Sequence, residues 1–256
     1  MKGRIPEFQK VFCVSILTLV FLFLLAPVQA RADIIAISGM ANIFGAGHAT
    51  APSPGGGGGG VLPPSVTFVP GLSRILTFSS VTGTVSCCGG FGPNGPDGGT
   101  TAGGSTNISS LNGISGIVHD NRTMFLAGVF LNATEPSGAG PARLLFSNPE
   151  DFVDLFPVLG QTFFIGDGLT DTGALVQQFH APTDASRLFL GFIDAAGFNN
   201  SPGYYDDNTG SLTATLSITS PVPESPTVTL LGLGLVGIIG TILRERQQRK
   251  KEPVTN

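Results

Sequence analysis

The chain has 256 residues, with 17 acidic and 13 basic side chains and a formal net charge of −4 at pH 7. Between Arg31 and Leu243 it contains no lysine and only a few arginines, outnumbered by aspartate and glutamate. An acidic body of this kind repels polyanions, which excludes nucleic acid as a partner and favours a bound cation. Without its terminal segments, the stretch 31–220 has the length of one domain with its own core.

The N-terminus has the pattern of an export signal. A basic start precedes an apolar run over residues 11–26, and Val28-Gln29-Ala30 supplies small residues at the spacing that signal peptidase requires. We expect a signal peptide over residues 1–30, cleaved after Ala30 by signal peptidase. An uncleaved signal anchor is the alternative.

The body shows the pattern of an all-β domain. Glycine (37) and proline (19) are abundant, and short apolar runs alternate with turn residues. Apolar and polar residues alternate strictly over 212–218, as a half-buried strand requires. Strands are expected at 34–38, 65–69, 75–85, 123–131, 142–146, 161–165, 174–180, 187–194 and 212–218. This number of strands predicts a jelly-roll-like β-sandwich.

One short helix is expected between Asn148 and Pro157. Asn148 can cap it, and a proline and two acids suit its first turn, namely Pro149, Glu150 and Asp151. Three apolar residues at i, i+3 and i+4 would cover an open end of the sandwich, namely Phe152, Leu155 and Phe156.

Two segments are of low complexity. The glycine run 55–60 is not followed by the Gly-Lys-Ser/Thr of a phosphate-binding loop, so we expect a flexible surface loop there. The segment 89–110 is long for a loop in a compact domain, and such loops are usually functional or disordered.

Cys87 and Cys88 are the only cysteines of the expected mature chain, because Cys13 leaves with the signal peptide. In an oxidising compartment, three outcomes are open: a strained disulfide between neighbours, two free thiols or an intermolecular bridge. A metal site is less favoured, since neither a C-x-x-C motif nor a histidine cluster accompanies the pair.

The densest group of oxygen donors lies in residues 198–211, which also hold both tyrosines of the chain, Tyr204 and Tyr205. Calcium binds six to eight oxygens in a flexible cage, and a loop rich in Asn and Asp can supply them. The donors are Asn200, Asp206, Asp207, Asn208 and Thr209. The alternative is a plain turn, because Pro-Gly and Asp-Asn-Thr-Gly are both good turn formers.

The stretch 187–194, this loop and the strand after it resemble the C-terminal part of the calcium-dependent galactophilic bacterial lectins, whose loop reads N-D-x-P-G-x-x-x-N-N-S-G-S. The resemblance implies calcium ligands at Asn200, Tyr204 (through its carbonyl), Asp207 and Asn208, and a sugar-contacting backbone position at Ser201. The rings of Tyr204 and Tyr205 are expected to stack on the sugar. Asn200 stands where the family has an acid, and Asp207 where it has an amide.

The stretch 91–97 is similar to the W-G-P-x-G-D stretch of the same lectins. The resemblance implies a carbonyl ligand near Ser86 or Cys87. The sugar-gripping His and Gln of the family have no counterpart here, and Asp97 is the candidate substitute. The insertion 132–175 has no place in the lectins either, so the resemblance covers about half of the body and specificity for galactose does not carry over.

The C-terminal segment 221–256 has the pattern of a membrane-directed tail. Val222-Pro223-Glu224-Ser225 precedes an apolar run over 227–243 and a basic cluster over 244–251. The run is just long enough for a transmembrane helix, and the basic cluster would stay cytoplasmic.

In order and composition this tail resembles the PEP-CTERM sorting signal, also catalogued as the ice-binding-protein C-terminal domain, with Ser225 in place of its second proline. The resemblance implies an exosortase as partner and cleavage near Pro223-Glu224. It also implies an inner-membrane intermediate, followed by release to the cell surface or extracellular matrix. A permanent single-span anchor is the alternative.

We expect a binding protein, not an enzyme. His48, His119 and His180 lie in no catalytic motif, and His119 is expected in a solvated hairpin. The acid pairs Asp151/Asp154 and Asp167/Asp171 give only weak support to a glycosidase.

The expected function is calcium-assisted binding of carbohydrate or polysaccharide outside the cell. Two alternatives remain, a structural matrix component without a defined ligand and an ice-binding protein. The Thr-x-Thr ridges that suit ice are represented by Thr213-x-Thr215 alone.

Overall fold

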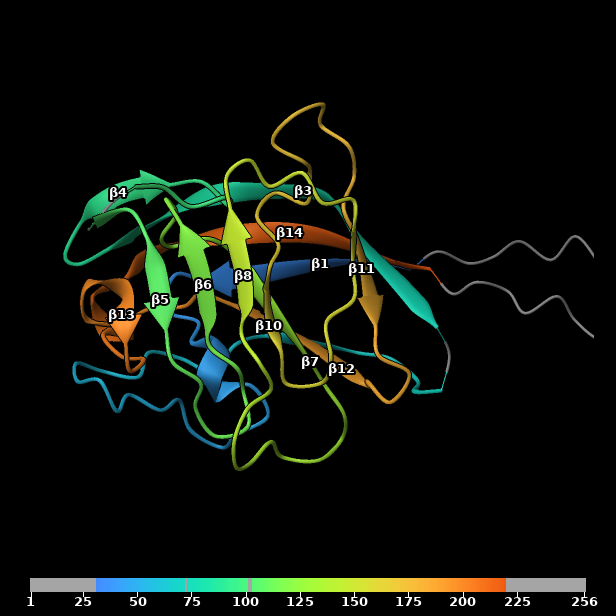
Figure 1. Ribbon diagram of the computed structural model, residues 1–256, viewed down its shortest axis with the longest axis horizontal. Coiled ribbons are helices and arrows are strands. Elements are labelled where there is room, and N and C mark those ends of the chain that lie inside the picture. The colour runs from blue at the N-terminus through green and yellow to red at the C-terminus, as the bar shows by residue number, and fades with distance from the viewer. Residues whose placement is uncertain (1–30, 72, 101–102, 220–256) are drawn as a thin grey trace, which may run out of the picture. The chain divides into compact units, whose positions relative to one another are not determined.

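The computed structural model describes residues 31–71, 73–100 and 103–219, which fold as an all-β unit of three sheets with short 3-10 helices (Figure 1). The all-β prediction is confirmed. The strands are β1 (Arg31–Ser38), β2 (Ser65–Thr67), β3 (Arg74–Cys87), β4 (Phe91–Asn94), β5 (Thr106–Ile108), β6 (Ile117–Asp120), β7 (Ala127–Leu131), β8 (Leu144–Ser147), β9 (Asp154–Leu155), β10 (Thr162–Phe164), β11 (Gln178–Ala181), β12 (Arg187–Gly191), β13 (Asn199–Asn200) and β14 (Thr209–Thr219). The 3-10 helices are η1 (Ile43–Gly45), η3 (Ala196–Phe198) and η4 (Tyr205–Asp207).

The expected export and sorting segments lie outside the described residues. These are the signal peptide with its cleavage site at Ala30, the Val222-Pro223-Glu224-Ser225 element and the apolar run 227–243. In the part of the chain that the structure describes, no helix is long and apolar enough to cross a membrane.

The largest sheet has the order β1-β14-β3-β11-β9, and β4 pairs with the end of β3. Strand β14 is antiparallel to both neighbours and alternates as predicted, with Leu212, Ala214 and Leu216 buried. A bulge interrupts its pairing with β3, because Ser79 is an extra residue opposite the Thr215–Leu216 step.

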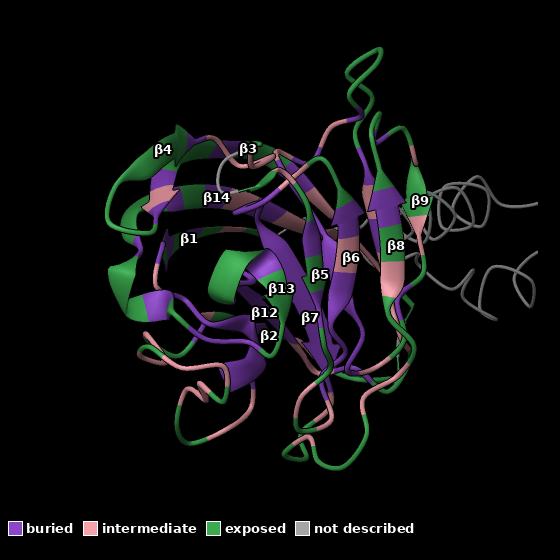
Figure 2. Cartoon of the chain, turned by 60° about the vertical axis from the view of Figure 1, so that its left-hand side comes forward, coloured by how far each residue is buried: buried purple, intermediate pink, exposed green. Residues whose placement is uncertain are grey.

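The second sheet has the order β10-β7-β12-β2 and the third β13-β5-β6-β8. In Figure 1 the strands β5, β6 and β8 run across the long strands β3, β14 and β1 that lie behind them. All five residues of β7 are buried, and Figure 2 shows this strand buried along its whole length. A strand with sheet neighbours on both sides and side chains packed on both faces must be apolar throughout.

Phenylalanines fill the space between the sheets. Phe163 of β10 stacks on Phe130 of β7 at a centroid distance of 5.1 Å and on Phe179 of β11 at 5.4 Å. Phe179 in turn meets Phe78 of β3 edge-on at 5.7 Å. Burial of these rings and their mutual contacts join the second sheet to the largest one.

Each of the nine predicted strands overlaps an observed strand, whereas five short strands, β4, β5, β6, β9 and β13, were not predicted. Two of these lie in the low-complexity segment 89–110, so parts of that segment are ordered sheet. Strands of two to four residues are too short to produce a period in the sequence.

The predicted helix between Asn148 and Pro157 is wrong. Residues 148–153 are irregular, with bends at 148, 149 and 153, and Asp154–Leu155 is strand β9, parallel to β11. Tertiary partners take the groups that a helix would use: the Glu150 N–H donates to the Asp171 carboxylate, and the Val153 carbonyl accepts from the N–H of Gln178. A short segment with weak helix propensity yields to such contacts.

Candidate functional site

The buried carboxyl of Asp194 follows β12. Asp194 is only 1% exposed, and its Oδ1 accepts a 2.7 Å hydrogen bond from the Ala195 N–H. Its Oδ2 is buried and has no hydrogen-bond partner among the described residues. Burial raises the pKa of Asp194 to about 7, and the negative charge of Asp207 adds to the increase.

Two further oxygen donors lie beside this carboxyl. Asn208 is 2% exposed, and in the described structure neither its amide oxygen nor its amide nitrogen has a partner of acceptable hydrogen-bond geometry. Its amide nevertheless approaches the Asp194 carboxyl as a hydrogen-bond donor of poor geometry, and this contact lowers the pKa of Asp194. The exposed carboxylate of Asp207 accepts a 3.3 Å hydrogen bond from the Cys88 N–H. Unpaired buried polar atoms cost free energy, and a cation between these oxygens would remove that cost.

The core tyrosine below the site is Tyr205. Its side chain is fully buried. Its hydroxyl accepts a hydrogen bond from the Asp194 N–H at 3.1 Å and donates one to the Phe192 carbonyl at 3.4 Å. The sugar contact expected for Tyr205 is therefore wrong, because the ring is packed inside the protein. Its role is to fix the backbone at Asp194.

The glycine run 55–60 is a wall of the same region, not the freely flexible loop expected from its composition. Its backbone exchanges hydrogen bonds with the site loop, from Gly55 N–H to the Pro202 carbonyl (2.9 Å) and from Tyr204 N–H to the Gly56 carbonyl (3.0 Å). A Cβ atom at Gly58 would lie 1.4 Å from a carboxylate oxygen of Asp206. The need for glycine is firmer at Gly55, where a Cβ would lie 2.3 Å from the backbone carbonyl oxygen of Ser201.

The predicted calcium ligands divide into two groups. Asn200 lies on β13, where it pairs with Ile108 of β5 and its carbonyl accepts from the Ser109 N–H at 2.7 Å. Asp207, in contrast, is tied to the turn after β3, since its carboxylate accepts from Cys88 and its carbonyl from Gly89. The group that shares one environment is thus Asp207, Asn208 and the unpredicted Asp194.

The remaining loop residues form the exposed rim. Ser201 is exposed, and Tyr204 is 38% exposed in a left-handed backbone conformation with its ring against the glycine run. Across the described ranges, no three His, Cys, Asp or Glu side chains are grouped to hold a metal ion. A cation here would need amide, carbonyl and water oxygens as well, as calcium commonly does.

Asp194 could have been noticed in the sequence. It closes the predicted strand 187–194 immediately before the donor-rich loop, and the end of a strand is where a side chain can turn toward a loop.

The two cysteines adjoin the site. Both thiols are free, with Cys87 buried and Cys88 exposed, and the Cys88 thiol donates to the Cys87 sulfur at 2.9 Å. Burial raises the pKa of both thiols, that of Cys87 far above its usual value. They are therefore weak nucleophiles and poor metal ligands at neutral pH.

Asp97 belongs to a different cluster. Its Oδ1 accepts from the Asp167 N–H at 2.8 Å, and burial raises its pKa while Arg122 lowers it. Arg122 is the centre of this cluster and donates to the Asp97 carbonyl, to Asn148 Oδ1 and to Asp171 Oδ2. Asp97 thus holds loops together, and its carboxyl is not directed at the loop 199–208.

His119 is buried, and the solvated hairpin expected for it is wrong. It lies on β6 with its ring centroid 5.2 Å from that of Phe125 and 5.4 Å from that of Phe164. Its Nε2 is 3.3 Å from Oε1 of the buried Glu150. Burial lowers the pKa of His119 to about 4 and raises that of Glu150 to about 7. Glu150 and the phenylalanine rings were missed because they come from segments far apart in the sequence.

The other two histidines each contact a carboxylate. His48 Nδ1 is 2.9 Å from Glu135 Oε1, and His180 Nε2 is 2.7 Å from Asp154 Oδ1. The acid pairs considered for a glycosidase have separate structural partners: Asp151 accepts from Thr172, and Asp167 accepts from the Leu169 N–H.

Comparison of the chain with known protein families, with characterised proteins and with solved structures found no match. The resemblances to the galactophilic lectins and to the PEP-CTERM signal therefore rest on the residues given for them above.

Proposed function

We propose that this chain is an exported, non-catalytic protein whose jelly-roll-like β-sandwich binds calcium at Asp194, Asp207 and Asn208 and, through the ion, carbohydrate. The observation that carries the proposal is the buried Asp194 carboxyl next to the buried Asn208 amide, whose oxygen has no hydrogen-bond partner in the described structure, with the Asp207 carboxylate near by.

The chemistry of these donors fits calcium. All three are hard oxygen ligands, and two carboxylates supply the charge that offsets dehydration of the ion. The charged group that acts on Asp194 is Asp207, whose negative charge raises the pKa of the buried carboxyl further and would favour a bound cation. Carbonyl groups and water would complete the six to eight ligands that calcium needs.

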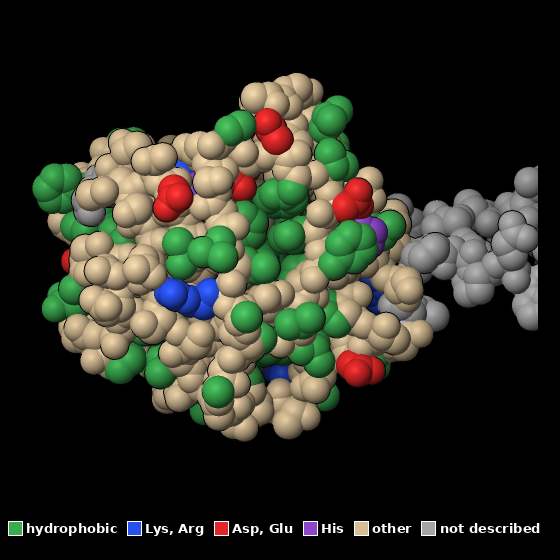
Figure 3. Space-filling view, in the orientation of Figure 1, with side chains coloured by type: hydrophobic (Ala, Val, Ile, Leu, Met, Phe, Trp, Pro, Cys, Tyr) green, Lys and Arg blue, Asp and Glu red, His purple; other side chains and the backbone are tan. Residues whose placement is uncertain are grey.

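The exposed rim supports carbohydrate as the second ligand. Asp207 and Ser201 are exposed and offer polar groups, while the partly exposed ring of Tyr204 offers an apolar face. On the face of the molecule shown in Figure 3, charged side chains are few and scattered among polar and apolar ones.

Calcium titration of the purified full chain tests the cation site. Calcium at about 100 times its dissociation constant should stabilise the folded state by about 2.7 kcal/mol, because the unfolded chain does not hold the site. Asp207→Ala should remove this response, and Asp184→Ala, at an exposed acid of another loop, should keep it. A melting curve that is the same with calcium and with chelator would reject the site and leave the structural matrix component as the function.

A glycan array with calcium and with chelator tests the second ligand. We expect glycan binding that requires calcium and is lost in Asp207→Ala. Calcium stabilisation without any glycan binding would retain the ion as a structural element only.

Export and sorting complete the proposal. The signal peptide would direct the chain across the inner membrane, and an exosortase would cleave the tail near Pro223-Glu224 and release the body to the cell surface or a polysaccharide matrix. Mass spectrometry of the surface-located protein should find a C-terminus within 222–225. Retention of residues beyond Leu243 would show a permanent anchor instead.

A further inference from the structure

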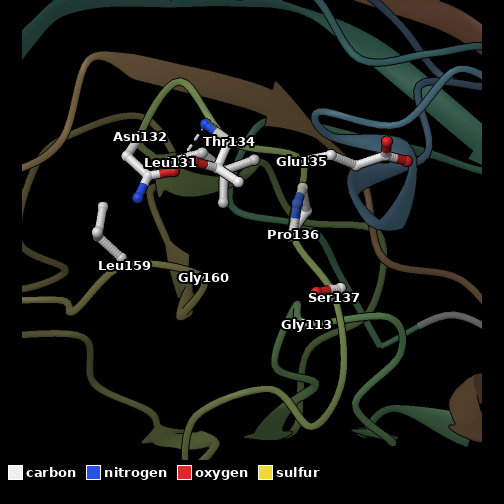
Figure 4. A pocket seen from close by; sticks show the side chains of 9 residues that line it. All are labelled: Gly113, Leu131, Asn132, Thr134, Glu135, Pro136, Ser137, Leu159 and Gly160. Carbon is white, nitrogen blue, oxygen red and sulfur yellow. Dashed lines mark hydrogen bonds between the residues drawn. The ribbon is translucent and has the colours of Figure 1, made fainter.

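Two adjoining surface pockets, both open to solvent, share no lining residue with the proposed calcium site and are called the first and the second cavity. The first has a volume of about 260 Å³, and the second, about 490 Å³, shares with it the ridge Glu135-Pro136-Ser137. Figure 4 shows the residues that line the first cavity, with the Glu135 side chain directed away from Asn132 and Leu159. Its carboxylate meets His48, which lines the second cavity.

The cavity walls are held in place by the fold. Arg187 of β12 donates to the carbonyl of Asn132 (2.9 Å from Nε) and to that of Thr134 (3.0 Å from Nη2), which fixes the loop after β7. On the opposite wall, the Gly113 N–H donates to the Gly138 carbonyl at 2.8 Å. Gly113 has a φ of +81°, and a Cβ there would lie 2.4 Å from the Ser137 nitrogen, so this wall needs glycine. A preformed cavity of this kind loses little conformational entropy on binding.

The lining selects the charge of a ligand. The first cavity presents the side chains of Asn132, Thr134 and Ser137 and no cationic group, while the Arg187 guanidinium is engaged with backbone carbonyls behind the loop. An anion such as a phosphate or a uronic acid would find no cationic side chain in the lining and would approach the Glu135 carboxylate. Anionic ligands are thereby disfavoured.

The lining also selects the shape and polarity of a ligand. Its apolar side chains are Leu131, Pro136 and Leu159, and none of the lining residues is aromatic. The Oδ1 of Asn132 accepts from the Thr134 N–H at 2.9 Å, which leaves the amide NH₂ to donate. Donors and acceptors around a small aliphatic surface match a ring with hydroxyl groups on its edge and C–H groups on its face.

We propose that the first cavity binds one uncharged sugar residue, with the second cavity, beside Glu135 and His48, accepting the adjoining residue of a chain. This site would be separate from the proposed calcium site and would not require the ion.

Ligand-observed NMR on the full chain tests the proposal, in a zwitterionic detergent without a sugar headgroup and with chelator present throughout. The probes are the methyl glycosides of glucose, galactose and mannose, with glucuronic acid as the charged counterpart. We expect at least one neutral glycoside to bind with a dissociation constant of about 1 mM, as a small ligand of few atoms does. Glucuronic acid should bind at least tenfold more weakly.

Substitutions locate the binding. Thr134→Trp, at an exposed position of the lining, should fill the cavity and lower the affinity at least tenfold. Thr183→Trp, at an exposed threonine of another turn, is the matched control and should leave the affinity unchanged. Absence of binding to the wild-type chain, binding that Thr134→Trp does not weaken, or equal binding of glucuronic acid would each overturn the proposal. Because chelator is present, these outcomes are independent of the calcium site.

Discussion

Two clusters of acids in this molecule each contain one buried carboxyl, Glu150 in the first and Asp194 in the second, and they differ in how their charge is balanced. Around Arg122, a guanidinium donates to Asp171 and to the backbone of Asp97, so the cation is part of the chain. Around Asp194, the nearby charge that acts on the buried carboxyl is the negative charge of Asp207. The first cluster holds its own cation, although Glu150 Oε1 is also buried there without a hydrogen-bond partner, whereas the second would obtain its cation from solution. This contrast separates an acid cluster that stabilises a fold from one suited to a ligand.

Arg122→Met should have the largest effect, because it removes the built-in cation and leaves partly buried carboxyls behind. We expect a loss of roughly 2–4 kcal/mol in the free energy of unfolding, somewhat less than for a fully buried pair since Arg122 and Asp171 are partly exposed. Denaturant unfolding measures it. Arg143→Met, at an exposed arginine that donates to Asn107, is the control and should cost less than about 1 kcal/mol. Equal losses in the two variants would contradict the central role of Arg122.

Asp194→Asn should act in the opposite direction. The folded-state pKa of Asp194, about 7, lies above its unfolded value, so the folded protein loses stability as the pH rises from about 4 to 7. Asparagine cannot ionise, and the variant should therefore be more stable than wild type by roughly 1–3 kcal/mol at pH 8 in chelator, and equal to it at pH 4.

Calcium should reverse this order, because it stabilises only the protein that carries the Asp194 carboxylate. Thermal melting at pH 4 and pH 8, with chelator and with calcium, measures all four cases. A calcium response that survives in Asp194→Asn would show that Asp194 is not a ligand.

Glu150→Gln removes the buried carboxyl of the Arg122 cluster, as Asp194→Asn does in the other cluster. Burial raises the pKa of Glu150 to about 7, so wild type again loses stability between about pH 4.5 and 7. The variant should gain about 1 kcal/mol at pH 8 and nothing at pH 4, with a calcium response equal to that of wild type. A lower stability of the variant at pH 8 would mean that ionised Glu150 has a favourable partner.

The sequence predicted the strands well because long strands carry a visible period. The alternation over 212–218 is that of β14, and the apolar runs of β7 and β12 are buried as expected. The prediction from sequence failed where tertiary contacts determine the local backbone conformation. Two residues expected in the first turn of a helix instead bond to a distant loop. The Glu150 N–H donates to the Asp171 carboxylate, and the Asp151 carboxylate accepts from the Thr172 N–H, which local propensity does not reveal.

The site was predicted in part, for a similar reason. The donor-rich loop identified Asp207 and Asn208, but their third partner, Asp194, is brought in by the turn that returns the chain from β12. Tyr205 was misjudged because an aromatic residue in a polar loop can point inward, and only the packing around Phe192 shows that it does. The six glycines looked flexible in sequence, yet backbone carbonyls of Ser201 and Met40 leave no room for a Cβ at Gly55 and Gly60.

The smallest effect is expected for the cysteine pair beside the calcium site. The group that holds Asp207 is the backbone N–H of Cys88, not its thiol, so Cys88→Ser keeps the 3.3 Å hydrogen bond. Calcium affinity in this variant should stay within about twofold of wild type, a difference of about 0.4 kcal/mol. Because Cys87 is buried and its sulfur lies against that of Cys88, we also expect a monomer on a non-reducing gel. A gel with mostly covalent dimers would contradict the intramolecular pair, and a lost calcium response in Cys88→Ser would show that the thiol itself takes part in the site.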